Sequence, residues 1–336
     1  MTDLRVCIVG LGAMGADHLV RIQRRTKGAR VVAAVARDGE RAARILTGHP
    51  GVVVFPDLER AIAAQAADAY VVATPGHTHA ALVETLLVAG LPVLCEKPLT
   101  TDVASAYRIL EQDQRLGRPH VQLGFMRRFD PEYAALREMV ATRTHGDLLM
   151  VHAQHRNATS PPGFTQSMLI TDSLSHELDV LPWVAGSPIS GIEVRFGRRN
   201  TNAASGLRDP LLVLVELANG TLLDVEMNVT AGFGYQVSTE AVFDRGVVQT
   251  GEFAGPRTSN AGGSGLAVPS GHATRFASAF DAQMQRWVDA VARGTLVDGP
   301  TAWDGLVGAL ACDAGVHALD GRVRTVDLPE RPAFYR

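Results

Sequence analysis

The segment Leu4-Arg-Val-Cys-Ile-Val-Gly10-Leu-Gly12-Ala-Met-Gly15 joins a run of apolar and β-branched residues to a glycine-rich turn. The run is typical of a buried strand, and the residues that follow it have the spacing GxGxxG. In that pattern Gly10 permits a tight turn, Gly12 lets the backbone approach a pyrophosphate, and Gly15 lets the next helix pack closely. The segment therefore predicts a strand, a turn and a helix whose N-terminus binds the phosphates of a dinucleotide.

Short apolar runs alternate with helical patterns through the first third of the chain. Continuous apolar strands between helices predict a parallel sheet covered on both faces, and right-handed crossovers then give a doubly wound domain. We therefore expect a dinucleotide-binding (Rossmann) domain over residues 1–125. The expected strands are residues 4–9, 31–36, 52–55, 69–73, 92–95 and 120–125, and the expected helices include 57–64, 78–89 and 102–116.

The pattern changes after Phe125 to longer runs with partial alternation. The dipeptide Asn219-Gly220 between two of these runs is a strong signal for an antiparallel hairpin. The Gly-, Ser- and Pro-rich residues 251–271 predict a surface loop. We expect residues 126–336 to form an α+β domain with a mostly antiparallel sheet, for substrate binding and oligomerisation. The expected elements are helix 131–141, strands 148–155, 192–198, 211–217 and 222–229, and helices 274–293 and 301–319.

The composition is that of an ordinary globular protein: 336 residues, 46% hydrophobic and 20% charged, are enough for two domains. The net charge is only -3 and the basic residues are dispersed, which argues against a nucleic-acid or anionic-membrane partner. The apolar run at the N-terminus is only about six residues long, too short for a secretion signal or a membrane span. We therefore expect a cytoplasmic protein.

The 3 cysteines and 11 histidines show no spacing typical of a metal site, so no metal is expected. Cys7 and Cys95 each lie in an apolar run, which is typical of buried structural thiols, with a catalytic thiol as the alternative. The tight cluster His77-Thr-His79 follows an expected strand and fits a role in cofactor binding.

The choice of cofactor depends on the end of the second strand, where the chain reads Ala36-Arg37-Asp38. An acidic residue at this position binds the ribose hydroxyls of NAD, whereas an arginine accommodates the 2′-phosphate of NADP. The sequence therefore favours NADP over NAD. The alternative is that Arg37 is a solvated loop charge and that Asp38 binds the ribose.

Two polar segments follow the fourth and fifth strands: Thr74-Pro75-Gly-His77-Thr-His79 and Glu96-Lys97-Pro98. Ligands of open α/β sheets bind beyond the carboxyl ends of the strands, so both segments should border the nicotinamide. A lysine at a strand end can be merely solvated. Lys97, however, lies between an acid and a rigid proline, and this makes it a candidate for a fixed polar group.

A possible general base lies in Thr171-Asp172-Ser-Leu-Ser-His176-Glu-Leu-Asp179. Helical spacing places Asp172 and His176 at i and i+4 on one face, with Asp179 three residues further on. A carboxylate beside an imidazole can orient the ring and stabilise its protonated form, which a base for an alcohol proton requires. The alternative is a pair of polar residues on the surface of a helix.

Together with Gly124-Phe-Met-Arg-Arg-Phe-Asp130, these segments resemble the glucose-fructose oxidoreductase and inositol dehydrogenase superfamily. Within it, the chain is similar to the inositol 2-dehydrogenases, and the likeness runs over essentially the whole sequence. The glycine motif and Glu96-Lys97-Pro98 are shared with the superfamily. The more specific segments are Gly124-Phe-Met-Arg-Arg-Phe-Asp130, His155-Arg-Asn157, Gly299-Pro-Thr-Ala-Trp-Asp-Gly305 and the closing Pro332-Ala-Phe-Tyr335.

The resemblance implies a role for each of these residues. It implies that Lys97, Asp172 and His176 form the catalytic set. The residues implied to bind the ring hydroxyls of the substrate, with Lys97, Asp172 and His176, are Arg127, His155, Asn157 and Tyr235, although Tyr235 can equally be a core aromatic. The cofactor-binding residues expected from the motifs and the resemblance are Gly10, Gly12, Ala13, Met14, Gly15, Ala36, Arg37, Thr74, Pro75, His77, His79, Glu96, Lys97 and Met126.

Two positions depart from the pattern of the NAD-specific inositol enzymes. Ala36-Arg37 replaces the acidic strand end, and Phe233 stands where a second tyrosine is expected, which can alter the choice of polyol. The antiparallel sheet has few helices to cover it, and this, with the resemblance, predicts a homotetramer.

The sequence thus predicts an NAD(P)-dependent dehydrogenase that moves a hydride between a nicotinamide and a cyclic polyol, with myo-inositol and its 2-keto product as the leading pair. Another sugar or an aminocyclitol is a second candidate for the substrate, because fold alone does not choose among them. Two further functions are compatible with these residues: a cofactor-binding regulatory protein without turnover, and an imine or enone reductase that does not need the Asp-His pair.

Overall fold

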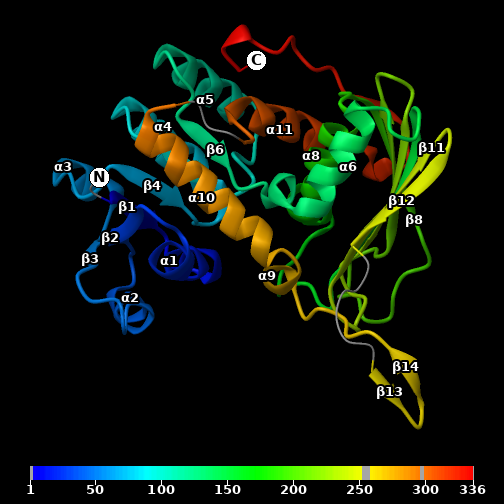
Figure 1. Ribbon diagram of the computed structural model, residues 1–336, viewed down its shortest axis with the longest axis horizontal. Coiled ribbons are helices and arrows are strands. Elements are labelled where there is room, and N and C mark those ends of the chain that lie inside the picture. Colours follow the sequence, from blue (N-terminus) through cyan, green and yellow to red (C-terminus); the bar gives the residue numbers. More distant parts are fainter. Residues whose placement is uncertain (1–2, 252–257, 296–298, 336) are drawn as a thin grey trace. The chain divides into compact units, whose positions relative to one another are not determined.

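The computed structural model describes residues 3–251, 258–295 and 299–335 (Figure 1). Contacts divide the chain into two compact units. The first comprises Met1–Met126, Phe280–Ala309 and Glu330–Arg336, and the second comprises Arg127–Ala279 and Leu310–Pro329. In the described part of the chain no helix is both long and apolar enough to cross a membrane.

The first unit contains a six-stranded parallel sheet in the order β3-β2-β1-β4-β5-β6. The order reverses between β1 and β4, which places a ligand crevice beyond the carboxyl ends of these strands. The predicted doubly wound α/β class is confirmed. The strands are β1 (Leu4–Val9), β2 (Ala29–Val35), β3 (Val53–Phe55), β4 (Ala69–Val72), β5 (Val93–Cys95) and β6 (Val121–Leu123). The helices are α1 (Ala13–Arg25), α2 (Gly39–Ile45), α3 (Leu58–Ala63), η1 (Gly76–Thr78), α4 (His79–Val88), α5 (Val103–Arg115) and the terminal η5 (Ala333–Tyr335).

Two glycines of the first turn are required by packing. Gly10 has φ +93, and a Cβ there would lie 2.7 Å from Thr74 Cγ2. A Cβ on Gly15 would lie 1.9 Å from the carbonyl oxygen of Gly10, so any larger residue would push α1 away from β1. A Cβ on Gly12 would meet nothing within 4 Å. The first and third glycines therefore shape the turn, and the second faces open space.

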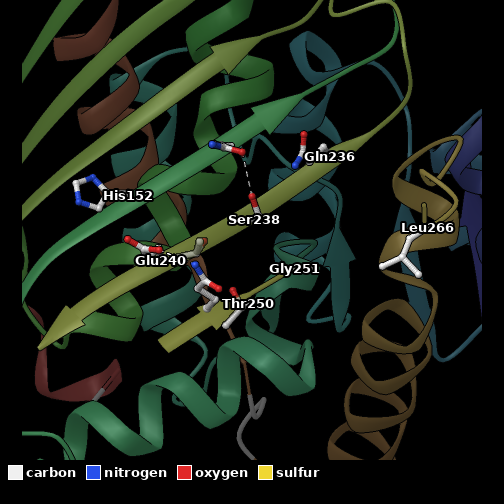
Figure 2. A pocket seen from close by; sticks show the side chains of 10 residues that line it. His152, Gln236, Ser238, Glu240, Thr250, Gly251 and Leu266 are labelled. Carbon is white, nitrogen blue, oxygen red and sulfur yellow. Dashed lines mark hydrogen bonds between the residues drawn. The ribbon is translucent and has the colours of Figure 1, made fainter. Parts of the chain in front are cut away.

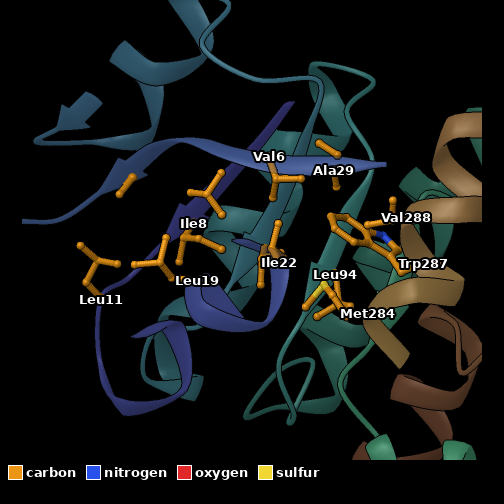
Figure 3. Packing of buried hydrophobic residues seen from close by; sticks show 14 of the residues in the cluster. Val6, Ile8, Leu11, Leu19, Ile22, Ala29, Leu94, Met284, Trp287 and Val288 are labelled. Carbon is orange, nitrogen blue, oxygen red and sulfur yellow. The ribbon is translucent and has the colours of Figure 1, made fainter. Parts of the chain in front are cut away.

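The core of the first unit includes a helix from much later in the chain. Helix α10 (Ala277–Arg293) places Met284, Trp287 and Val288 in one apolar cluster with residues of β1, such as Ile8, and with Leu94 of β5 (Figure 3). The predicted boundary at 125/126 assigned all later residues to the second domain, whereas residues 280–309 and 330–336 belong to the first unit. Local periodicity predicts a helix but does not reveal which distant strand it contacts.

The second unit contains a seven-stranded sheet in the order β12-β11-β7-β10-β9-β8-β15. The neighbours are antiparallel except β7 and β10, which confirms the predicted α+β arrangement with a mostly antiparallel sheet. Asn219-Gly220 forms the turn between β9 and β10, with Gly220 at φ +87. The strands are β7 (Leu148–Arg156), β8 (Ile189–Phe196), β9 (Leu211–Leu217), β10 (Leu222–Asn228), β11 (Gln236–Phe243), β12 (Gly246–Thr250) and β15 (Arg324–Thr325).

The helical segments outside the first sheet include a π-helical turn directly before α8. They are η2 (Met126–Phe129), α6 (Pro131–Ala141), α7 (Gln166–Met168), the π-helix η3 (Leu169–Leu174), α8 (Ser175–Ala185), α9 (His272–Arg275), α11 (Ala302–His317) and η4 (Ala318–Asp320). The loop predicted over residues 251–271 contains a small hairpin of β13 (Thr258–Asn260) and β14 (Gly263–Gly265), and residues 252–257 of that prediction lie outside the described residues.

Burial alternates along the strands of the second sheet. In β11, for example, every second side chain is buried, and the residues between them, such as Ser238 and Glu240, are partly exposed. The inward side chains include Tyr235 just before β11 and His155 of β7, both buried. The sheet therefore has one packed face and one face that is open in a single chain.

Candidate active site

The first unit has a crevice of about 850 Å³ beyond the carboxyl ends of β1, β2 and β4. It brings together six of the predicted cofactor-binding residues, namely Gly10, Gly12, Ala36, Arg37, Thr74 and Pro75. At its edge α1 begins at Ala13 after the N-cap Gly12, which offers no side chain to bind the free backbone N–H groups. Such a helix end favours an anionic group.

Two of the acidic residues that line this crevice each cap the start of a helix. Asp38 caps α2, accepting a hydrogen bond from the backbone N–H of Arg41 at 2.9 Å, and Asp57 caps α3 in the same way. Arg41 lines the crevice beside Arg37, and the sequence arguments missed it. Arg41 lies four residues after Arg37, at the start of a helix, and this spacing could have indicated that it lines the crevice too.

Glu96, which directly precedes Lys97, is buried with an exposed fraction of 7%. Nε2 of His18 in α1 donates to its Oε1 at 2.7 Å, and a Cβ on Gly124 would lie 2.7 Å from its Oε2. Burial alone would raise the pKa of Glu96, but the hydrogen bond from His18 and the nearby charges of Lys97 and His79 lower it overall. The carboxylate predicted to bind cofactor thus bonds to His18, a residue that the sequence arguments missed.

The remaining predicted cofactor residues differ in accessibility. His77 and Ala13 are exposed, and Met14 and Lys97 are partly buried. His79 and Met126 are buried, and both ring nitrogens of His79 contact backbone carbonyls. The neighbouring histidines of the cluster therefore have different surroundings, although they share one turn.

The proposed base lies where η3 passes into α8. The sequence predicted regular helical spacing from Asp172 to His176, but residues 169–174 are π-helical, a conformation often found at functional sites. Asp172 and His176 are both partly exposed, whereas Glu177 and Asp179 are buried. Asp179 bonds to Arg128, with 2.5 Å from Nη2 to Oδ1. The segment thus leaves Asp172 and His176 partly exposed and buries Glu177 and Asp179.

Glu177 is the centre of a buried ion pair that the sequence arguments missed. Nη1 of Arg127 donates to its Oε1, and Nδ1 of His155 lies 3.1 Å from its Oε2. The exposed fractions of Arg127, Glu177 and His155 are 1%, 2% and 3%. Burial alone would raise the pKa of Glu177, but the charge of Arg127 and the bond to His155 lower it to about 2. The opposite charge of Glu177 outweighs burial and raises the pKa of Arg127.

The other residues predicted to bind substrate lie near this ion pair or at the surface. The Tyr235 ring packs edge-on against His155 with ring centres 5.9 Å apart, and burial raises the pKa of its hydroxyl. Asn157, just after β7, is partly exposed. Phe233 is exposed, with 54% of its surface accessible. In the described part of the chain, no group of three or more His, Cys, Asp or Glu residues could hold a metal ion.

Comparisons with known proteins agree with this architecture. Residues 4–125 match the model of an oxidoreductase family with an NAD-binding Rossmann fold, and residues 133–249 match the GFO/IDH/MocA C-terminal domain. Inositol 2-dehydrogenase of Corynebacterium glutamicum is 52% identical over 333 residues, which cover 99% of each chain. Inositol 2-dehydrogenase of Leifsonia xyli subsp. xyli is 54% identical over 334 residues, which cover 99% of this chain and 98% of the other. The crystal structure of myo-inositol dehydrogenase from Lactobacillus casei, in complex with NAD(H) and myo-inositol, superimposes with a TM-score of 0.96 at 31% identity, over 100% of both chains.

Removal of the Glu177 charge should destabilise the second unit. Glu177→Gln leaves the buried Arg127 without its counter-charge, and we expect the free energy of unfolding in urea at pH 7 to fall by about 3–5 kcal/mol. Because the pKa of Glu177 falls from 4.5 to about 2, its contribution is complete above pH 4.5 and is lost as the pH falls toward 2. The variant should therefore lose less stability than the wild type when the pH is lowered through that range.

The control is Glu138→Gln, an exposed acid on α6 of the same unit, which should change the free energy of unfolding by less than about 0.5 kcal/mol. Equal stability of the Glu177→Gln variant and the wild type at pH 7 would show that the ion pair does not hold this unit together.

Proposed function

The chain belongs to the GFO/IDH/MocA oxidoreductase family, and on that premise we propose that it is an NAD(P)-dependent dehydrogenase that oxidises myo-inositol to the 2-keto product, an inosose. The observation that carries the proposal is the likeness to inositol 2-dehydrogenases over the full length of the chain. A neighbour of the same fold binds NAD(H) and myo-inositol.

The crevice of the first unit fits a dinucleotide. A Cβ on Gly12 would project into open space, which is where the backbone can approach a diphosphate, and the N-terminus of α1 favours its charge. The turn from Gly10 to Gly15 would hold the diphosphate, and the segment from Ala36 to Arg41 would hold the adenosine ribose. When bound, the nicotinamide supplies the acceptor for a hydride.

We propose that side chains of the protein accept the hydroxyl proton of the substrate. His176 accepts the hydroxyl proton of the substrate while the hydrogen of the same carbinol carbon leaves as hydride, with the electron pair of the C–H bond. Asp172 orients His176 and stabilises its protonated form, and Lys97 donates a hydrogen bond to the substrate oxygen as it becomes a carbonyl. Positioned general base catalysis of this kind contributes roughly 10²- to 10⁴-fold to the rate.

The ring hydroxyls of the substrate are proposed to bind Asn157 and Tyr235 in addition to the catalytic set. Arg127 and His155 bond to Glu177, the residue after His176. We propose that they act on substrate binding through that ion pair, which holds the start of α8 in place.

Cofactor choice is proposed to favour NADP over NAD. Ala36 provides no carboxylate for the ribose hydroxyls, and the Asp38 carboxylate is bonded to the start of α2. Arg37 and Arg41 both line the crevice and can pair with a 2′-phosphate through charge-assisted hydrogen bonds. One such bond contributes about 1.5–3 kcal/mol, which corresponds to roughly 10- to 100-fold in affinity.

We propose that the chain assembles into a homotetramer through the open face of the second sheet. This sheet has a hollow of about 520 Å³. The side chains that line it include His152, Ser238 and Glu240 (Figure 2). The hydrophobic residues Leu149 and Leu212 are exposed on strands β7 and β9 of the same sheet, with 46% and 40% of their surfaces accessible. A monomeric mass by light scattering at micromolar concentration would contradict this proposal.

The catalytic assignment predicts large losses of turnover without loss of fold. Lys97→Ala and His176→Ala should each lower kcat for myo-inositol by at least about 10²-fold. Lys27→Ala and His317→Ala, which remove exposed side chains of the same types, should leave it unchanged. The assay follows absorbance at 340 nm with a panel of inositols, pyranoses and aminocyclitols and both cofactors. Near wild-type turnover in either of the first two variants would disprove the assignment.

The proposed roles of Ala36 and Arg37 predict a preference for NADP that substitutions at these positions reverse. The wild type should have a higher kcat/KM with NADP than with NAD, and an Ala36→Asp, Arg37→Val double variant should reverse the order. Arg41→Ala should weaken NADP use by about tenfold, the loss of one charge-assisted hydrogen bond, with little effect on NAD. Arg44→Ala, at another arginine of the same helix that does not line the crevice, is the control. A tenfold or greater preference of the wild type for NAD would mean that Arg37 is only a solvated loop charge.

A further inference from the structure

His79 begins α4 and is buried, with an exposed fraction of 1%. Its Nδ1 lies 2.7 Å from the carbonyl oxygen of Pro98, and its Nε2 lies 2.8 Å from the carbonyl oxygen of Thr74. A carbonyl oxygen only accepts hydrogen bonds, so each ring nitrogen must carry a hydrogen for both bonds to form. A neutral imidazole has one N–H, whereas an imidazolium has two.

The groups around His79 supply a counter-charge for an imidazolium. The charge of His79 is among the influences that lower the pKa of the buried Glu96, together with the hydrogen bond from His18 and the charge of Lys97. Glu96 directly follows β5, and His79 begins the helix that packs against that strand. Lys97 is partly exposed, so water can solvate its charge, whereas Glu96 and His79 are both buried and can balance each other as opposite charges.

The hydrogen bonds of His18 also support a positive charge on His79. Its Nε2 donates to Glu96, and among the described residues its buried Nδ1 has no hydrogen-bond partner. If His18 is neutral, its Nδ1 carries no hydrogen and so leaves no N–H without an acceptor. A charged His18 would leave a buried, charged N–H without an acceptor, which costs more. The positive charge therefore belongs on His79 rather than on His18.

The other carboxylates near α4 are bonded elsewhere. Glu84 of α4 pairs with Arg108 of α5 at 3.0 Å. Asp102 caps α5, and it accepts hydrogen bonds from the backbone N–H and the hydroxyl of Ser105. His77 and Lys97 are the other basic side chains of the two turns that His79 joins, and neither can balance a positive charge. Glu96, whose pKa the charge of His79 lowers, is the carboxylate that we assign as its counter-charge.

We propose that His79 is a buried imidazolium that ties the turn after β4 to the turn after β5, and that it is a positioning residue for Lys97 and for the cofactor crevice. The two carbonyls that it binds belong to Thr74, which lines the crevice, and to Pro98, which follows Lys97. Each lost bond frees one of these turns. The kinetic part of this inference rests on the proposed function, whereas the charge of His79 does not.

The charge state is tested directly by NMR of the full chain labelled with ¹⁵N-histidine, without substrate or cofactor. The His79 signals are identified by their loss in His79→Asn. Both ring nitrogens should be protonated from pH 6 to 8, with slow exchange because the ring is buried. One bare nitrogen at His79 in this range would overturn the proposal. This measurement needs no turnover, so it remains decisive even if inositol is not the substrate.

The positioning role is tested by the pH dependence of kcat with NADP and myo-inositol. His79→Asn keeps a donor for one carbonyl and His79→Leu keeps none, so kcat should fall in the order wild type, Asn, Leu. A lost hydrogen bond of a charged donor corresponds to roughly 10- to 100-fold. The loss should fall mainly on kcat, with a smaller change in the KM for cofactor.

Deprotonation of His79 removes one bond, so the wild type should lose activity at high pH in a step that His79→Asn lacks. The control His317→Asn, at an exposed position of α11, should keep the wild-type profile. Wild-type kcat and an unchanged pH profile in His79→Leu would overturn the positioning role. Failure of the wild type to oxidise any polyol would instead contradict the proposed function.

Discussion

A charge that leaves water must be paired inside the protein, and two buried carboxylates that meet this requirement organise the site. Glu96 is held by His18 and lies next to Lys97 in the chain, while Glu177 is held by Arg127 and His155 and follows His176. In both places the acid points inward and its neighbour remains partly exposed. Lys97 and His176 are therefore each anchored by the residue beside them, which fixes the backbone while leaving the side chain partly exposed.

At the cofactor crevice, acidic side chains likewise hold the backbone in place. Asp38 and Asp57 are acids at the ends of neighbouring strands, but each is bonded to the first turn of the next helix. The arginines at positions 37 and 41 line the crevice together with these two acids. The proposed preference for NADP rests on this arrangement, in which the strand ends in Ala36 and two arginines line the crevice.

Much of the fold follows from local sequence patterns. The glycine motif, the alternation of apolar runs and helices, and the Asn219-Gly220 turn predict both sheets, because each signal depends on residues that are close in the chain. The buried ion pairs do not follow from local patterns, because Glu96 and His18 are 78 residues apart in the chain and Glu177 and Arg127 are 50 residues apart. The placement of Trp287 in the first unit and the π-helical turn at Asp172 likewise depend on packing between distant segments. The sequence therefore indicated Glu96, Arg127 and His155 as site residues, but not the ion pairs that they form with His18 and Glu177.

The central claim is that the chain removes a hydride from the carbinol carbon of an inositol and passes it to a nicotinamide. The most direct test uses myo-inositol deuterated at C2, with NADP or NAD, and mass spectrometry of both products. We expect one deuterium in each molecule of reduced cofactor, in equal amount to the inosose formed, and a slower reaction than with unlabelled substrate if hydride transfer limits the rate. Reduced cofactor without deuterium, or no reduction with any inositol, would contradict the account.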